Sequence, residues 1–145
     1  MMIRFITRNV IVPVLPDIAW EYVGDFDALA SWHPGVPPVE MENNADPTGI
    51  GSVRTFSVDG RVVAREQLRA RDAEKRSYSY EVLDPMLPVR DYVATIAVVP
   101  HDQGSEIQWS ATYRSGDDAV AMIEQAYGDN VYSTGLKAVG EHFVA

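Results

Sequence analysis

The stretch from residue 115 to residue 143 constrains the fold most, because it has the pattern of one long helix that follows a series of strands. Its apolar residues recur at helical spacing: Val120, Ile123, Tyr127, Tyr132, Leu136, Val139 and Phe143. Ser115 and Asp118 have the spacing of a capping box, and the acidic residues here suit the positive end of a helix dipole. A long helix after consecutive strands predicts a sheet that curves around it.

Three glycines interrupt this helix, and two interpretations of them remain open. Each glycine costs about 1 kcal/mol relative to alanine in a helix interior. The first interpretation is a kink or break near residues 128–130. The second interpretation depends on Gly128 and Gly135, which are seven positions apart and therefore lie on nearly one face. Their missing side chains then leave room for a ligand beneath the helix. Both interpretations can hold together.

The first third of the chain predicts a strand followed by two helices. β-Branched residues from Ile3 to Val12 favour a strand, and Pro13 ends it. A helix is expected over residues 16–23, because Pro16 suits a first helical turn. A second, short helix is expected over residues 28–31, since the residue before Pro34 is biased away from helical geometry. Two tandem helices after the first strand are unusual in a mostly β chain.

The middle of the chain predicts a run of antiparallel strands. After a weak strand over residues 36–43, five strands follow at short spacing: Gly51–Val58, Arg61–Arg71, Ser77–Leu83, Asp91–Val99 and Glu106–Arg114. Asp59-Gly60 is the strongest hairpin signal, because both residues tolerate positive φ. Hairpin connections make the sheet antiparallel. The order is β-αα-β6-α, which is an α+β arrangement in one domain over residues 1–145.

Alternation along the strands assigns their inward faces. The side chains expected to share a face are Arg54, Phe56 and Val58; Val62, Ala64, Glu66 and Leu68; Tyr78, Tyr80 and Val82; and Ile107, Trp109, Ala111 and Tyr113. An arginine and a glutamate therefore face inward among apolar residues. Desolvating a lone charge costs several kcal/mol, so such a residue is paired or functional.

Three explanations for this inward charge stay open. One is a structural ion pair between Arg54 and Glu66, and another is a strand phase shifted by a bulge. The third is a cavity with one cation, one carboxyl group and the phenols of Tyr80 and Tyr92. Such a group set can orient a carbonyl or an oxyanion and move a proton.

Charge and composition narrow the possible partners. A formal net charge of −9 argues against nucleic acid and against anionic membranes, both of which attract basic surfaces. No run of 18 apolar residues predicts a membrane span, and the N-terminus lacks a signal-peptide pattern. The absence of cysteine is compatible with the cytoplasm, which is the expected location. The oligomeric state is unknown from the sequence.

No motif for a metal or a cofactor is present, and we expect neither. His33, His101 and His142 lack metal-ligand spacing. Gly49-Ile50-Gly51 leads into a strand and not a helix, so it does not form a phosphate loop. His33 is expected to be a loop histidine that backbone groups or water satisfy, although a place at a cavity mouth is the alternative.

Sequence motifs across nearly the whole chain resemble the START/Bet v 1-like (SRPBCC) superfamily. They are the segment from Trp20 through Gly24-Asp25-Phe26 to Trp32-His33-Pro34; Gly49-Ile50-Gly51-Ser52-Val53-Arg54; the tract from Glu66-Gln67-Leu68 to Glu81; Leu87–Tyr92; and Ser105–Trp109. Within the superfamily the chain is similar to bacterial polyketide cyclase/dehydrase-like proteins and to the plant lachrymatory-factor synthase and abscisic-acid receptor branch. The resemblance implies a helix-grip fold, in which a curved antiparallel sheet encloses a cavity against the C-terminal helix.

The resemblance also implies functional residues. In the synthase branch, an arginine and a glutamate on successive cavity strands work with two tyrosines behind them. By motif these fall on Arg54, Glu66, Tyr80 and Tyr92, while the gate and latch sequences of the hormone receptors are absent. The residues expected to contact a ligand are Phe56, Tyr78, Met86, Leu87, Trp109, Tyr132 and Gly135. For Trp109 a place in the core is the alternative, and the loop of Met86 and Leu87 either covers the cavity or packs on the helix.

Two functional classes follow from this combination. One is a small acid/base enzyme that isomerises, cyclises or dehydrates a hydrophobic carbonyl-, enol- or sulfenic-acid-like molecule, with Arg54 holding negative charge and Glu66 moving the proton. The other is a binding or carrier protein for a hydrophobic small molecule, which uses the same polar groups for specificity only.

Overall fold

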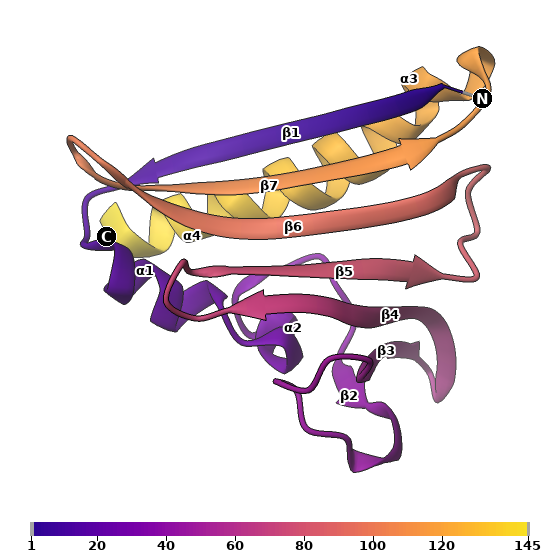
Figure 1. The fold of residues 1–145 in the computed structure, drawn as a ribbon, viewed down its shortest axis with the longest axis horizontal. Helices are drawn as coiled ribbons and strands as arrows, with labels where there is room; N and C mark the ends of the chain where they lie inside the picture. Colours follow the sequence, from indigo (N-terminus) through magenta and orange to yellow (C-terminus); the bar gives the residue numbers. More distant parts are fainter. Residues whose placement is uncertain (1, 145) are drawn as a thin grey trace.

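The computed structural model describes residues 2–144, which form one curved antiparallel sheet and a long C-terminal helix (Figure 1). The sheet has seven strands in the order β1-β7-β6-β5-β4-β3-β2. The strands are β1 Ile3–Val12, β2 Val39–Met41, β3 Val53–Val58, β4 Arg61–Asp72, β5 Ser77–Leu83, β6 Arg90–His101 and β7 Gly104–Arg114. The expected β-αα-β6-α order and helix-grip fold are confirmed.

Two short helices connect β1 to β2. Helix α1 spans Pro16–Val23, with a proline in its first turn and Ala19 and Val23 buried. A 3₁₀ turn, η1 (Phe26–Ala28), leads into α2 (Leu29–Trp32), which lies one residue later than the sequence predicts. Both helices cover one end of the sheet (Figure 1).

Hairpin connections of two to six residues set the order of β3 to β7, whereas β1 joins the sheet over a long distance in sequence. Asp59 and Gly60 connect β3 to β4 with φ of 52° and 77°, so the predicted turn is confirmed. β1 pairs with β7 from Ile3 opposite Arg114 to Val12 opposite Ser105. The strand that opens the chain therefore lies beside the last strand.

The C-terminal helix is continuous but changes its hydrogen bonding along its length. It consists of a 3₁₀ turn, η3 (Asp117–Ala119), one α turn, α3 (Val120–Ile123), a π-helical segment, η4 (Glu124–Ser133), and α4 (Thr134–Val144). Of the kink or break considered for residues 128–130, a break is wrong, because the chain keeps turning there with wider turns. The capping box is also not formed: Gly116 is the N-cap, and the Ser115 hydroxyl donates to the Gly116 carbonyl (3.0 Å).

The glycines of this helix allow it to lie close to other protein groups. A Cβ on Gly128 would lie 2.6 Å from Arg8 Nη2, and a Cβ on Gly135 would lie 2.5 Å from His33 Cδ2. A Cβ on Gly140 would lie 3.1 Å from Val10 Cγ2. The space left by the missing side chains is therefore filled by β1 and by the loop after α2, and no room for a ligand arises there.

Two β-bulges change the strand faces that simple alternation predicts. One lies between Phe56 and Ser57 opposite residues 62–64, and the other lies between Leu68 and Ala70 on β4. Beyond the first bulge, at the β3–β4 hairpin, Val58 and Val62 are exposed, so neither is buried with the inward residues as expected. Arg54 and Phe56 precede the bulge and keep the predicted phase.

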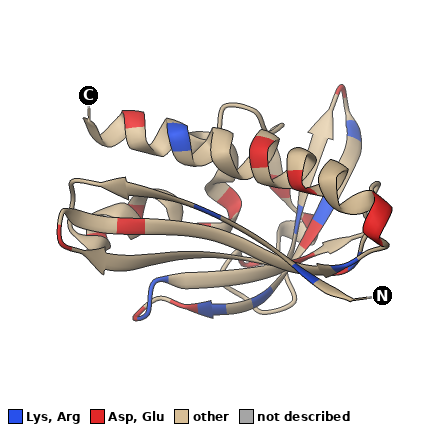
Figure 2. Ribbon diagram, turned by 90° about the horizontal axis from the view of Figure 1, so that it is seen from above, with Lys and Arg blue, Asp and Glu red and all other residues tan. Residues whose placement is uncertain are grey.

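The core lies between the concave face of the sheet and the helices. Its large members come from β5 to β7, η1 and the C-terminal helix: Phe26, Tyr78, Tyr80, Tyr92, Ile96, Ile107, Trp109, Tyr113, Ile123, Tyr132, Leu136 and Val139. Figure 2 shows the C-terminal helix on one side of the sheet, with acidic residues along it. Among residues 2–144, no helix is both long and apolar enough to cross a membrane.

Candidate functional site

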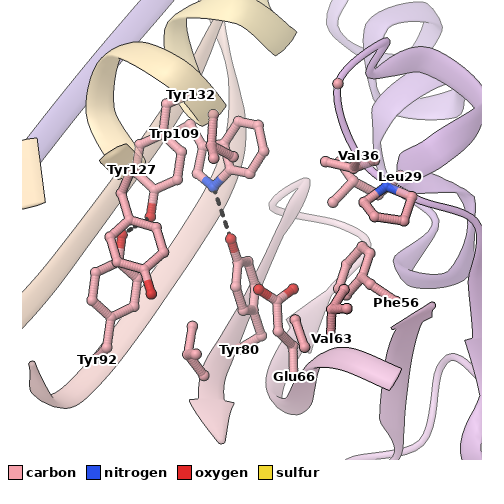
Figure 3. A pocket seen from close by; sticks show the side chains of 15 residues that line it. Leu29, Val36, Phe56, Val63, Glu66, Tyr80, Tyr92, Trp109, Tyr127 and Tyr132 are labelled. Atoms are coloured by element: carbon pink, nitrogen blue, oxygen red, sulfur yellow. Dashed lines mark hydrogen bonds between the residues drawn. The ribbon is translucent and has the colours of Figure 1, made fainter. Parts of the chain in front are cut away.

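A cavity of about 220 Å³ lies between β3–β7, the loop after α2 and the π-helical segment, and it is partly open to solvent (Figure 3). Most of its wall is apolar. Its lining residues are Leu29, Gly35, Val36, Pro37, Phe56, Val63, Ala64, Glu66, Tyr80, Val82, Tyr92, Trp109, Tyr127, Val131 and Tyr132. The sequence analysis implicates eleven residues, and six of them line this cavity: Phe56, Glu66, Tyr80, Tyr92, Trp109 and Tyr132.

Glu66 is the one acidic or basic residue among the Asp, Glu, Lys, Arg and His types in this lining. Its neighbour across the strand pair is Arg54, whose Nε donates to Glu66 Oε1 (2.9 Å) and whose Nη2 lies 2.7 Å from the same oxygen. No residue among 2–144 bonds to the second oxygen, Oε2, in this structure. The side chain is 14% exposed, so the carboxylate is held by one oxygen and open at the other.

Arg54 does not line the cavity, which corrects the expectation that its guanidinium contacts a ligand. The side chain is 0% exposed and lies behind Glu66. Nη1 donates to the Phe26 carbonyl (2.7 Å) and to the Tyr78 hydroxyl (3.3 Å), and the guanidinium carbon lies 4.2 Å from the Phe26 ring centroid. Alternation placed Arg54 on the correct face, but the rings of η1 and β5 cover it.

The charge of Arg54 is stable in this position. Burial lowers the pKa of Arg54, but the phenols around it and the Glu66 carboxylate raise it more, so the net pKa is raised. The guanidinium therefore stays protonated and offsets the carboxylate charge. The predicted ion pair is present, and it coexists with a cavity.

Two hydrogen bonds fix the phenols of the cavity wall (Figure 3). The indole Nε1 of Trp109 donates to the Tyr80 hydroxyl (3.1 Å), which leaves the phenol proton of Tyr80 free to be donated elsewhere. The hydroxyls of Tyr92 and Tyr132 bond to each other. Within that pair one hydroxyl donates, so the other keeps a free proton.

Burial keeps these phenols protonated. It is the first cause of the raised pKa of Tyr80, Tyr92 and Tyr132, and the negative charge of Glu66 adds to the shift in each case. All three are therefore neutral hydrogen-bond donors near neutral pH. The cavity combines neutral donors with one acceptor carboxylate.

Several lining residues were not identified from the sequence. Tyr127 lies on the π-helical segment with its ring 4.3 Å from that of Tyr92. Val36, Pro37 and Val131 form part of the rim, and Val63 turns inward at the bulge. Tyr127 belongs to the helical apolar pattern, which is the signal that could have found it, but that pattern alone does not distinguish the core from a cavity wall.

Four residues predicted to contact a ligand lie elsewhere. Met86 is 87% exposed on the loop after β5, because that loop extends away from the cavity, and Leu87 packs partly buried against the core. Tyr78 is buried behind Arg54, with its ring against Phe26. Gly135 faces His33 and Trp32, whose side chains fill the space beside it.

His33 connects the cavity rim to the helix. Its Nδ1 accepts from the Gly35 N–H (3.0 Å), and its Nε2 lies 2.7 Å from the Val131 carbonyl, so the neutral ring donates through Nε2. The residue is 2% exposed, and burial lowers its pKa. The prediction that backbone groups satisfy His33 is confirmed. Among the described residues 2–144, no group of His, Asp and Glu side chains could hold a metal ion.

The arrangement has a definite chemical capacity. A carboxylate with one restrained and one free oxygen can accept a proton from a bound molecule. Neutral phenols fixed by hydrogen bonds can donate to an oxygen on which negative charge develops. Aromatic and aliphatic side chains around them exclude water and favour a hydrophobic molecule.

The fold and the cavity together define a helix-grip domain that binds hydrophobic small molecules. The family model described as "Polyketide cyclase / dehydrase and lipid transport" matches residues 5–142. The chain belongs to this family, which confirms the resemblance to the START/Bet v 1-like superfamily. No curated protein sequence matches the chain.

Solved structures support the same assignment. A protein from Thermobifida fusca is 30% identical, with a TM-score of 0.89 over 96% of this chain and 92% of that one. The protein XoxI from Bacillus cereus is 24% identical, with a TM-score of 0.80 over 99% of this chain and 96% of that one. Norcoclaurine synthase from Thalictrum flavum is 21% identical, with a TM-score of 0.76 over 99% of this chain and 87% of that one. At that identity the synthase shows the fold alone; one of its structures is a complex with dopamine and hydroxybenzaldehyde.

Proposed function

We propose that the domain binds a hydrophobic small molecule in this cavity and catalyses a proton transfer on it, without a cofactor, as an isomerisation, cyclisation or dehydration. The observation that carries the proposal is how the two carboxylate oxygens of Glu66 are bonded. Arg54 restrains Oε1, while no group of residues 2–144 bonds to Oε2, which lies on a largely apolar wall. A carboxylate placed in this way is suited to take a proton from a carbon or oxygen acid and to return it.

The phenols supply the hydrogen-bond donors that the proposed reaction needs. The Tyr80 hydroxyl accepts from Trp109, so its own proton is available to an oxygen of the substrate. Tyr92, paired with Tyr132, orients the substrate from the neighbouring strand. These donors stabilise the negative charge that develops on an enolate or alkoxide when Glu66 removes the proton.

Arg54 takes a different role from the one that the family resemblance implies. Because it is buried behind Glu66, it acts on the substrate only through the carboxylate. We assign it as a positioning residue, which fixes the direction of Oε2 and keeps the site close to neutral overall. The dopamine and hydroxybenzaldehyde held by norcoclaurine synthase are small hydroxylated aromatic molecules, which supports a ligand of that size in this fold.

A non-catalytic carrier is the second candidate function. It is favoured by the ion pair, which gives Glu66 a structural role that requires no reaction. The lining is also mostly apolar, and a carrier needs only a few polar groups to select its ligand. The two candidates differ in whether Glu66 changes its protonation state on a bound molecule.

Glu66→Gln separates them. Small carbonyl and enol compounds would first be screened for binding by thermal shift, and the bound ones tested for conversion. The amide keeps shape and hydrogen bonding but cannot titrate, so turnover should fall by roughly 10²–10⁴-fold while affinity changes far less.

Glu106→Gln is the matched control, because Glu106 lies on the outer face of β7 and accepts from Asn9 away from the cavity. It should leave turnover unchanged. Full turnover in Glu66→Gln would contradict the acid/base role, and binding without conversion of any compound would favour the carrier.

A further inference from the structure

The π-helical segment of the C-terminal helix gives the cavity two tyrosines. Tyr127 and Tyr132 are five positions apart on Glu124–Ser133, and both line the cavity. On an α-helix, residues five apart point about 140° away from each other. The i→i+5 bonding of a π-helix brings them to one face instead. The wider turns are therefore the reason that Tyr127 reaches the cavity beside Tyr132.

Contacts outside the cavity hold this register. Arg8 Nη2 donates to Glu124 Oε2 and to Asp129 Oδ1, both at 3.0 Å, and these acceptors are again five positions apart. Gly128 lies between them and leaves space for the guanidinium. The Thr134 hydroxyl donates to the Asp129 carbonyl (3.3 Å), another contact over five positions. None of these residues lines the cavity, so their effect on it is indirect.

The hydroxyl of Tyr127 is the unengaged phenol of the cavity. Tyr80, Tyr92 and Tyr132 each have a hydrogen-bond partner on the wall, whereas no described residue bonds to the Tyr127 hydroxyl. Figure 3 shows Tyr127 on the helix side of the cavity, across from Glu66. Burial, with a smaller effect from the Glu66 charge, raises the pKa of Tyr127 to about 12, so it is a neutral donor.

The size and charge of the cavity restrict what can lie between these two groups. An apolar cavity of about 150 Å³ holds benzene, so about 220 Å³ accommodates a ring system about half as large again. That is the size of a bicyclic aromatic ring system. Because the cavity is partly open, small substituents on that ring system can extend toward the cavity mouth. The lining includes no lysine or arginine that could pair with an anion, and the charge of the covered Arg54 is already paired with Glu66. A neutral ligand fits both conditions.

We propose that Tyr127 is a specificity-determining residue, which binds an acceptor oxygen at one end of a neutral, bicyclic-sized ligand while the other end donates a hydrogen bond to Glu66. This inference rests on the proposed function only for the place of binding, and it holds for a catalyst and for a carrier. It requires that the ligand have polar groups at both ends.

Three probes test it: a naphthalene with a hydroxyl and an acetyl group at opposite ends, the naphthol without the acetyl group, and the acetylnaphthalene without the hydroxyl. Affinities are measured by isothermal titration with the wild-type protein and with Tyr127→Phe. The variant should lose about fivefold in affinity for the acetylnaphthol, the equivalent of about 1 kcal/mol for one neutral hydrogen bond. Its affinity for the naphthol should not change.

Tyr22→Phe is the matched control. Tyr22 stacks on His142 outside the cavity, and its substitution also removes one phenol hydroxyl. It should bind all three probes as the wild type does. An equal loss for all probes in Tyr127→Phe would show a packing role and overturn the proposal, as would no loss for the acetylnaphthol. If the wild type binds none of the probes, the ligand class is wrong. Turnover in Glu66→Gln is independent of these outcomes, so failure of the proposed function is recognised separately.

Discussion

Replacing Arg54 by methionine should destabilise the domain more than the loss of an ordinary surface ion pair. Methionine has a similar length and no charge, so the variant leaves Glu66 without its cation on an apolar wall. Breaking a buried pair from one side costs about 3–5 kcal/mol. The Phe26 carbonyl also loses its donor, which adds about 1–3 kcal/mol if no water replaces it. Since domains are stable by only about 5–15 kcal/mol, this change is easily measured.

The double variant Arg54→Met/Glu66→Met isolates the interaction. Glu66→Met alone leaves a buried guanidinium unpaired and should also cost about 3–5 kcal/mol. With both residues apolar, no charge remains, so the double variant should lose only the contacts to Phe26 and Tyr78, about 1–3 kcal/mol. The coupling energy between the two sites is then at least about 3 kcal/mol.

Urea unfolding followed by tryptophan fluorescence gives each free energy, because Trp32 and Trp109 are buried near the cavity. The slope with urea should stay constant across the four proteins, which shows that the unfolded states are comparable. If the two single variants add up to the double variant within about 0.5 kcal/mol, the sites are independent. The role of Arg54 as the residue that holds Glu66 would then be wrong.

Two further predictions concern the contacts of the C-terminal helix. Burial lowers the pKa of His33 in the folded domain, so the unfolded chain binds a proton at this residue more readily. The contribution of neutral His33 to the free energy of unfolding is therefore fully present above about pH 6.5 and should be lost as the pH falls below that value. His33→Gln should flatten the pH dependence of urea unfolding, and an unchanged slope would contradict this. Gly135→Ala should lower stability by about 1–3 kcal/mol, because its Cβ would meet His33 at 2.5 Å. Gly140→Ala, which meets a Val10 methyl at 3.1 Å, should have a smaller effect on the thermal midpoint, and equal midpoints would refute the steric argument.

Local signals were enough to predict most of the fold. The hairpin at Asp59-Gly60 follows from the need for positive φ, and β5 has the bounds that its composition predicts. Alternation placed Glu66 and Tyr80 on the cavity side, because Glu66 lies between the two bulges of β4 and the residue opposite Tyr80, not Tyr80 itself, begins a bulge. These features depend on residues that are close together in sequence.

Features that depend on distant residues could not be predicted in this way. The π-helical register depends on Arg8, which lies more than a hundred residues from Glu124, and the apolar spacing of the helix does not indicate it. Alternation gives the face of Arg54 but not its depth, which is set by Phe26 from another segment. The bulge that turns Val63 inward likewise has no marker in the sequence, since Val62 and Ala64 on either side of it suit a regular strand.

The pairing of β1 with β7 has a kinetic consequence. Ile3 lies opposite Arg114, so this contact closes a loop of more than a hundred residues, whereas β3 to β7 are joined by short hairpins. Non-local pairing forms late, because loop closure costs entropy before its contacts are made. Arg8 on β1 also holds the π-helical segment, so the helix and the first strand complete the domain together. Until then the edge of β7 is open to pairing with other chains, so the pairing of β1 also protects the sheet against aggregation.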